Sequence, residues 1–156
     1  LSEEEFQLQA STDLGALLLD GLGDGVFLRA TNCGNEQMKM QTAFGILQAT
    51  RTRISKTEYI SCPSCGRTLF DLQETTAKIR SKTSHLKGLK IGIMGCIVNG
   101  PGEMADADYG YVGTGVGKIT LYKEKEVVQR NIPSEDAVNA LIDLIKTNGD
   151  WVAPLS

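Results

Sequence analysis

The sequence predicts an α/β fold built on a mixed sheet, and two observations carry this prediction. Between residues 58 and 94, a short apolar run, an amphipathic stretch and a second apolar run follow one another, which is the order strand–helix–strand. Such a unit needs a right-handed crossover and pairs its two strands in parallel. Further on, three short strand-like runs separated by turn residues indicate a meander. We therefore expect an α/β (α+β) sandwich in which helices pack against a mixed sheet.

The first residues contain only a fragment of such a fold. The end of an amphipathic helix over 13–20, a glycine-rich turn over 21–25 and a short buried strand over 26–28 follow in that order. Polar residues 30–35 predict a linker, and a helix follows over 36–50. Because a helix and one strand cannot bury a core alone, we expect residues 1–32 to be the tail of a preceding domain with its linker. Residues 33–156 are then the C-terminal domain.

The remaining residues predict a compact module. Its expected elements are a strand over 58–60, a helix over 69–84, a strand over 89–94, short strands over 109–112, 118–122 and 127–130, and a last helix. We expect Ser134-Glu135-Asp136 to cap that last helix, whose apolar face runs from Ala137 to Ile145. The strands at 58–60 and 89–94 should lie side by side, with their carboxyl ends at one edge of the sheet.

Length and composition describe one ordinary globular domain with part of another attached. The chain has 156 residues, 41% of them hydrophobic and 22% charged, which suffices for a buried core. The net charge of -3 and the pI near 5.2 argue against a nucleic-acid binder. No apolar run of about 18 residues is present, so we expect no membrane span. The residues from Leu1 to Phe6 resemble no signal or transit peptide, and we expect them to continue from a longer protein.

Three of the four cysteines are placed to meet. Cys62 and Cys65 form a C-x2-C pair after the first strand of the module, and Cys96 follows its second strand. Because parallel α/β strands place ligand-binding loops at their carboxyl ends, both cysteine loops should share one edge of the sheet. So few cysteines in a chain of this length indicate an intracellular metal or redox site, not a secreted disulfide framework. We expect Cys33, in a polar turn upstream, to be an incidental free thiol.

Residue types alone leave three kinds of site open. An iron–sulfur cluster is favoured because it takes cysteine thiolates. A structural zinc site normally requires a second C-x2-C pair or a paired histidine to complete its four ligands. The single histidine, His85, ends a predicted helix, where we expect it to be solvated. A thioredoxin-like dithiol would use C-P-x-C at the start of a helix, but this leaves Cys96 without a role.

The loop around Cys96 is rich in glycine and ends on a carboxylate. It runs Gly95-Cys96-Ile97-Val98-Asn99-Gly100-Pro101-Gly102-Glu103. Glycines let the backbone come close to a bulky inorganic centre, and peptide N–H groups can donate to its sulfides. Oxygen ligands are uncommon on iron–sulfur clusters, so spacing alone favours an exposed Glu103 over a ligand. Asn99 is either a turn residue or a polar group directed at substrate.

Together, the two cysteine loops resemble a known family. Cys62-Pro63-Ser64-Cys65-Gly66-Arg67 and the loop from Gly95 to Glu103 are similar to the paired signatures of the 4-hydroxy-3-methylbut-2-enyl diphosphate synthases. The resemblance extends from Gln7 to Trp151 and implies a sulfite-reductase-like iron–sulfur domain that follows a substrate-binding TIM barrel. It also implies a [4Fe-4S] cluster held by Cys62, Cys65, Cys96 and Glu103, with Asn99 near the substrate.

The reaction that the resemblance implies is a reductive ring opening. The substrate is the diphosphate 2-C-methyl-D-erythritol 2,4-cyclodiphosphate, in the non-mevalonate (methylerythritol phosphate) route to isoprenoids. Ferredoxin or flavodoxin would supply the two electrons, and the Glu103 carboxylate would move aside to open one iron. Since the family's main diphosphate-binding residues lie upstream, we expect this chain alone to bind a cluster but not to turn over substrate. Arg67, Lys118 and Lys123 are then expected to be solvated or docking residues.

One departure resembles a larger form of the family. The two-domain form has a diphosphate-binding arginine where this chain has Phe27, within Gly23-Asp24-Gly25-Val26-Phe27-Leu28. In the larger form an extra barrel-like domain is inserted before the cluster domain, and residues 1–32 would be the tail of that insertion. The larger form implies either bacterial cytoplasm or plastid stroma, and the stretch from Ser84 to Ile91 favours a bacterial protein.

Overall fold

The computed structural model describes residues 1–98 and 100–154. The chain divides into two compact units, Leu1–Ser55 and Lys56–Ser156. The sequence predicted that the C-terminal domain begins at residue 33. The assignment of residues 33–55 to one domain or the other in the whole protein stays a prediction.

The first unit is a pair of helices, α1 (Glu3–Leu19) and α2 (Glu36–Ala49). α1 begins with a capping box, in which the Ser2 hydroxyl accepts from the Glu5 N–H and the Glu5 carboxylate accepts from the Ser2 N–H. The Asn35 side chain caps α2 by accepting from the Met38 N–H at 2.8 Å. The two helices bury a small shared core, formed by Ala10, Leu18, Ile46 and Leu47.

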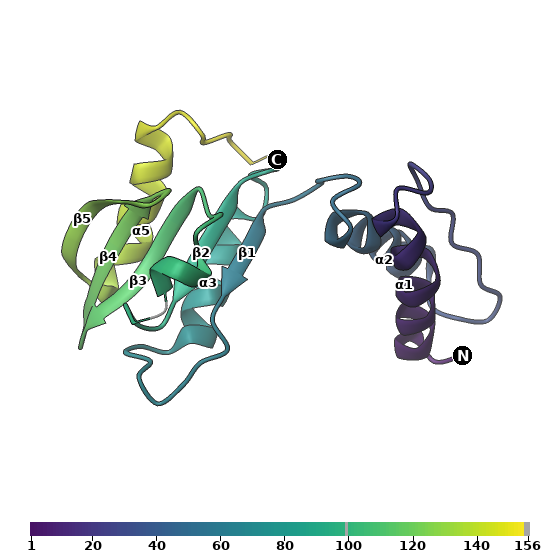
Figure 1. Cartoon of the computed structure of the whole chain (residues 1–156), viewed down its shortest axis with the longest axis horizontal. Coiled ribbons are helices and arrows are strands. Elements are labelled where there is room, and N and C mark those ends of the chain that lie inside the picture. The colour runs from purple at the N-terminus through teal and green to yellow at the C-terminus, as the bar shows by residue number, and fades with distance from the viewer. Residues whose placement is uncertain (99, 155–156) are drawn as a thin grey trace. The chain divides into compact units, whose positions relative to one another are not determined.

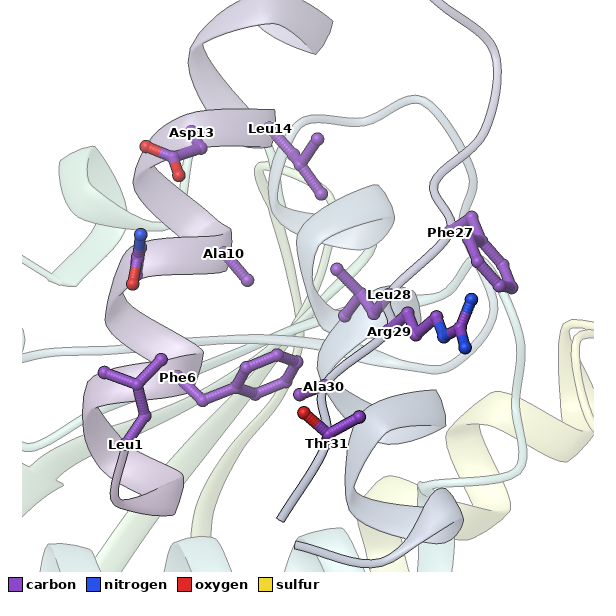
Figure 2. A pocket seen from close by; sticks show the side chains of 11 residues that line it. Leu1, Phe6, Ala10, Asp13, Leu14, Phe27, Leu28, Arg29, Ala30 and Thr31 are labelled. Carbon is purple, nitrogen blue, oxygen red and sulfur yellow. The ribbon is translucent and has the colours of Figure 1, made fainter. Parts of the chain in front are cut away.

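The predicted buried strand over 26–28 is wrong. Among the described residues the only sheet lies in the second unit, and residues 26–30 form neither helix nor strand. The Phe27 side chain is 86% exposed. Figure 2 shows the apolar groove beside this segment, where Phe6 and Leu14 of α1 line a cavity of about 470 Å³ together with Leu28. An apolar run becomes a buried strand only where a neighbouring strand satisfies its backbone groups, and this unit supplies none.

The second unit is built on a five-stranded mixed sheet (Figure 1). Its strands, in spatial as well as chain order, are β1 (Glu58–Ser61), β2 (Lys90–Met94), β3 (Tyr109–Gly115), β4 (Lys118–Lys123) and β5 (Glu126–Pro133). The first three are parallel to one another, and β4 and β5 continue the sheet in antiparallel fashion. The predicted α/β class with a mixed sheet is confirmed, and the finer likeness to sulfite reductase stays a prediction.

Two helices cover one face of the sheet, α3 (Leu72–Thr83) and α5 (Ser134–Thr147). Figure 1 shows both behind the sheet, while the short helix α4 (Gly100–Glu103) lies in front. The main core joins the helices to inward-facing residues of the strands, which are Ile79, Ile91, Ile93, Tyr109, Tyr111, Ile119, Leu121, Leu141 and Ile145. All of these side chains are almost fully buried, so the helices hold the sheet that carries the cysteine loops.

Met104 covers the opposite face of the sheet just after α4. A Cβ placed on Gly92 would lie 2.7 Å from the Met104 Cβ, and one placed on Gly110 would lie 2.5 Å from its sulfur. The absence of side chains at these two glycines therefore lets Met104 rest on β2 and β3. This contact fixes the segment that leads out of the glycine-rich loop.

The helix starts differ from the prediction for local reasons. α3 starts at Leu72 and not at residue 69, because the Asp71 carboxylate accepts from the Glu74 N–H at 2.8 Å and caps the helix there. The prediction that Ser134 and its neighbours cap α5 is wrong. Pro133 occupies the N-cap without a side-chain bond. Glu135 and Asp136 instead lie in the first turn, where negative charge favours the helix dipole.

The C-terminal residues fold back onto the edge of the sheet that lies opposite the cysteine loops. The Tyr109 hydroxyl donates to the Asp150 carboxylate at 2.6 Å, and Lys123 pairs with the same carboxylate at 3.2 Å. His85 remains partly exposed, as expected of a solvated residue, but it also has partners. Its Nε2 lies 2.8 Å from the carbonyl oxygen of Val152, and its ring forms a T-shaped pair with Trp151. Within residues 1–98 and 100–154, no helix has the length and apolarity needed to cross a membrane.

Candidate metal centre

The parallel strands bring the two cysteine loops together. β1 and β2 are in register, with Ser61 opposite Ile93, so Cys62 and Gly95 leave the same edge of the sheet. Cys62, Cys65, Cys96 and Glu103 all line one cavity of about 90 Å³ at this edge. These four residues are the ligand set that the family resemblance implied, gathered from the two loops and α4.

Backbone hydrogen bonds join the two loops directly. The Gly95 N–H donates to the Cys62 sulfur at 3.2 Å. The Gly95 carbonyl accepts from the Leu69 N–H at 3.0 Å. Both backbone groups of Gly95 are therefore bonded to the other loop. Its N–H bonds Cys62, a prospective ligand, and its carbonyl bonds Leu69, just after the C-x2-C pair. Such N–H donation to a cysteine sulfur is the kind of contact that stabilises a thiolate ligand.

Thr68 closes the turn that presents Cys65. Its N–H donates to the Cys65 carbonyl at 3.0 Å, and its hydroxyl accepts from the Cys65 N–H at 3.1 Å. Ser64, inside the C-x2-C pair, adopts a φ of 63°, in the left-handed region that a serine rarely enters. This conformation turns the chain sharply between Cys62 and Cys65, which allows both sulfurs to face one cavity.

Glycines permit close packing beneath the site. A Cβ on Gly95 would lie 2.7 Å from the Thr68 methyl carbon, and a Cβ on Gly113 would lie 2.5 Å from the Gly95 carbonyl oxygen. In the same way, a Cβ on Gly100 would lie 2.9 Å from the Cβ of Met94. The loops therefore rest directly on β2 and β3, and no larger residue fits at these positions without movement.

Arg67 sets the local electrostatics of the cysteines. The backbone N–H of Arg67, and after it the guanidinium, lower the pKa of the Cys65 thiol, and Cys96 makes a smaller contribution in the same direction. The same thiol raises the pKa of the Arg67 guanidinium, and the charge of Cys96 adds to this effect. Cys65 is thus favoured as a thiolate, the form in which cysteine binds a metal.

The predicted site residues can be placed one by one. Cys62 and Cys96 are half-buried, while Cys65 and Glu103 are exposed at the mouth of the cavity, and all cysteines are free thiols. Asn99 lies outside the described residues. Cys33 belongs to the first unit, where it is buried beside Phe6 and Met38 and far along the chain from the other three.

The donor set fits an iron–sulfur cluster. Across residues 1–98 and 100–154, no three His, Cys, Asp or Glu side chains are gathered closely enough to hold one metal ion. A [4Fe-4S] cluster does not need such a gathering, because each of its ligands binds a different iron. Three soft sulfur donors and one carboxylate, arranged around a shared cavity with an N–H aimed at one sulfur, match its requirements.

Sequence reasoning missed three residues that shape this site. Arg67 was expected to be solvated or to dock a partner, yet it lines the cavity beside Cys65. Thr68 and Gly113 were not singled out at all. For Arg67 and Thr68 a signal was present, since both directly follow the C-x2-C-G run in the chain. For Gly113 there was none, because its contact with Gly95 depends on the pairing of β2 with β3.

Comparison with known proteins identifies the family. The model of the GcpE protein C-terminal domain matches residues 58–147, more than half of the chain. The chain belongs to the GcpE family. The match begins at the first residue of β1 and ends at the last residue of α5, so the GcpE domain coincides with the sheet, its helices and both cysteine loops.

Three relatives show how far the similarity reaches. A protein of Parabacteroides distasonis named 4-hydroxy-3-methylbut-2-en-1-yl diphosphate synthase (flavodoxin) is 69% identical over 149 residues, which are 96% of this chain and 24% of that protein. The Porphyromonas gingivalis protein of the same name is 66% identical, over 95% of this chain and 25% of its own length. A chloroplastic rice protein (Oryza sativa subsp. japonica), named as the ferredoxin form, is 60% identical over 99% of this chain and 21% of its length.

The GcpE-family chain thus spans about a quarter of the length of the curated relatives that it matches. The similarity to these relatives includes the first unit as well as the second, since 149 or more of 156 residues are aligned in two of the three cases. Their names cover both electron donors that the sequence had implied.

Proposed function

We propose that this chain is the cluster-binding C-terminal part of an enzyme of the methylerythritol phosphate pathway. The whole enzyme would convert 2-C-methyl-D-erythritol 2,4-cyclodiphosphate into 4-hydroxy-3-methylbut-2-enyl diphosphate. The conversion consumes two electrons and two protons and releases one water. The single observation that carries the proposal is the shared cavity of Cys62, Cys65, Cys96 and Glu103 in a chain that is 69% identical to a named synthase.

The residues of this chain would have distinct roles at the cluster. Cys62, Cys65 and Cys96 would hold three irons through thiolates, and Glu103 would hold the fourth through a carboxylate. An oxygen ligand is harder than a thiolate and binds iron in a cluster less firmly. Glu103 is exposed at the mouth of the cavity and ends a one-turn helix, so its side chain has room to withdraw. When bound, the cluster supplies single electrons and one iron open to the substrate oxygen.

Asn99 is proposed to lie near the substrate, on the strength of the family resemblance and its position between Cys96 and Glu103. The diphosphate would be gripped mainly by a TIM barrel of the same protein. Support for that arrangement comes from the relatives, which are about four times as long as this chain. We expect no turnover by this chain in isolation.

Flavodoxin is the proposed electron donor, and the bacterial cytoplasm the proposed compartment. Both follow from the relatives at 69% and 66% identity, which are bacterial and carry flavodoxin in their names. The rice relative is less similar, carries ferredoxin in its name and is chloroplastic. A protein with this chain would therefore receive electrons from flavodoxin, one at a time.

Residues 1–32 are proposed to be the tail of a barrel-like domain inserted before the cluster domain, together with the linker. The apolar groove beside residues 26–30 and the exposed Phe27 ring support this assignment, because this segment forms neither helix nor strand in this chain. The preceding part of the same protein is the proposed occupant of the groove, since the relatives extend well beyond the matched quarter.

The test is anaerobic reconstitution of the chain with iron and sulfide, followed by metal analysis and an absorption spectrum. We expect about four irons per chain and a broad band near ~400 nm. Glu103→Ala should give a cluster that loses iron more readily, because one iron loses its protein ligand. Asp106→Ala is the matched control, since it removes an exposed carboxylate close by that does not line the cavity.

Other outcomes would reject the proposal in different ways. A colourless chain that binds one zinc and no iron would indicate a zinc-stabilised binding module. A chain that reduces disulfides and keeps this activity after Cys96→Ser would indicate a C-x2-C dithiol oxidoreductase. An equally stable cluster in Glu103→Ala and in the wild type would remove Glu103 from the ligand set.

A further inference from the structure

Arg67 is the one Lys or Arg side chain among the described residues that line the metal-centre cavity. The cavity otherwise presents three thiols, the Glu103 carboxylate and uncharged side chains. Arg67 itself is exposed. A single permanent positive charge therefore faces a site that is expected to become strongly negative.

The fold holds Arg67 in this place. It stands inside the turn from Cys65 to Thr68, which is closed by hydrogen bonds in both directions between those two residues. The next residue, Leu69, is tied to the Gly95 carbonyl at 3.0 Å. Both ends of the short segment that carries Arg67 are thus anchored to the two ligand loops. The arginine cannot move far from Cys65 unless this turn opens.

We propose that Arg67 is a positioning residue for electron uptake, whose guanidinium lines the same cavity as Cys65 and stabilises the added negative charge of the reduced centre. The proposal rests on the proposed function, since it assumes that a cluster is bound. It assigns Arg67 to the centre itself, and not to a partner or to the main phosphate site.

The direction of the effect follows from charge. Four anionic ligands leave a [4Fe-4S] centre with a net negative charge, and one electron from a donor adds one more negative unit while the donor is oxidised by one electron. A cation close to the sulfur lowers the energy of the reduced state more than that of the oxidised state. Hydrogen bonds to cluster sulfurs act in the same direction. Arg67 should therefore raise the reduction potential and ease transfer from the donor.

The test is a redox titration of the reconstituted chain with dithionite and mediators, followed by absorbance and electron paramagnetic resonance. Arg67→Gln and Arg67→Met remove the charge, and Arg67→Lys keeps it. Lys118→Gln is the matched control. It removes one exposed charge at the β3–β4 turn, at the carboxyl end of β3, outside the cavity. Far-ultraviolet circular dichroism confirms that each variant is folded.

We expect both neutral variants to make reduction at least tenfold less favourable, a fall of about 59 mV for one electron. Arg67→Lys should keep most of the wild-type potential, and Lys118→Gln should change it far less. Loss of the cluster in both neutral variants, with retention in Arg67→Lys and Lys118→Gln, would overturn the proposed role in electron uptake and assign the Arg67 charge to cluster binding instead.

Two further results would overturn the inference alone. One is a wild-type potential in the neutral variants, and the other is an equal fall in Arg67→Lys and Arg67→Gln, which would show that charge is not the cause. If the wild-type chain binds no iron and sulfide at all, the proposed function fails and this inference fails with it. The wild-type measurement therefore separates the two failures.

Discussion

Gly113→Ala is the sharpest test of how the sheet supports the metal centre. Gly113 is a buried residue of β3, and a Cβ added there would lie 2.5 Å from the Gly95 carbonyl oxygen. Real Cβ atoms essentially never come within 3.0 Å of a neighbour, so residue 113 and the Gly95 carbonyl must separate by at least about 0.5 Å. The obstructing atom belongs to the backbone, which cannot turn aside as a flexible side chain would.

The expected cost is that of overpacking, about 1–3 kcal/mol of the free energy of unfolding. The same carbonyl accepts from the Leu69 N–H at 3.0 Å. If Gly95 moves away from β3, that hydrogen bond weakens, which adds about 0.5–1.5 kcal/mol. We therefore expect a total loss of about 2 kcal/mol or more. Because Gly95 also donates to Cys62, the variant should lose iron faster as well.

Urea unfolding followed by circular dichroism measures the first effect, and iron retention after dilution measures the second. Gly102→Ala is the control, since a Cβ there meets no atom within 4 Å and its φ is not in the left-handed region. It should stay within about 0.5 kcal/mol of the wild type. A Gly113→Ala variant as stable as Gly102→Ala would refute the close packing of β3 against the Gly95 loop.

Two further changes probe other parts of the chain. Phe27→Asp should alter the unfolding free energy of this chain by less than about 0.5 kcal/mol, because the ring is 86% exposed. In the full-length protein the same change should reduce stability if the preceding domain covers the groove. Equal thermal stability of the full-length wild type and variant would contradict this. Tyr109→Phe should cost about 1 kcal/mol at neutral pH, because it removes the hydroxyl that donates to Asp150 at 2.6 Å. That hydroxyl, followed by Lys123, lowers the pKa of the Asp150 carboxyl. A carboxyl with a lowered pKa contributes stability above its unfolded pKa, near 3.9. The difference in unfolding free energy between wild type and variant should therefore shrink as the pH falls through the acidic range. A difference that urea unfolding finds unchanged between pH 7 and pH 3 would contradict this interpretation.

The sequence alone predicted most of the second unit. The strands at 58–60 and 89–94 were found because both are short apolar runs that flank a helical period, and chain topology then required them to be parallel. Parallel pairing of these strands was enough to predict that Cys62 and Cys96 lie at the same edge of the sheet. The meander was equally visible, since turn residues separate its strands.

The errors arose where the outcome depends on a distant partner. Val26, Phe27 and Leu28 have the composition of a buried strand, but composition does not reveal whether a neighbouring strand exists. At α5, the serine, glutamate and aspartate suggested a capping motif, yet the chain enters the helix one residue earlier, at Pro133. The contacts of His85 with Val152 and Trp151 were not predicted, because they join positions far apart in the chain.

The site divides along the same line. The shared cavity of the three cysteines could be predicted, because C-x2-C spacing indicates a metal or redox site and the parallel strands bring Cys96 to the same edge. Glu103 could not be predicted from spacing, since an exposed loop carboxylate is common, and it entered through resemblance to a family. Neither Arg67 nor Thr68 was assigned to the site, because their roles come from their positions beside Cys65 in the folded chain and not from a residue pattern.

The folded-back C-terminal residues make the chain's single tryptophan a selective optical reporter. Trp151 lies against the edge of His85, and the Lys146 ammonium is 5.2 Å from the centre of its ring. Its emission therefore responds to whether the tail is docked at one end of the sheet, while absorbance of a bound cluster responds to the cysteine loops at the other end. Fluorescence and visible absorbance, recorded on the same sample, thus follow the two ends of one sheet separately and reveal whether they open together.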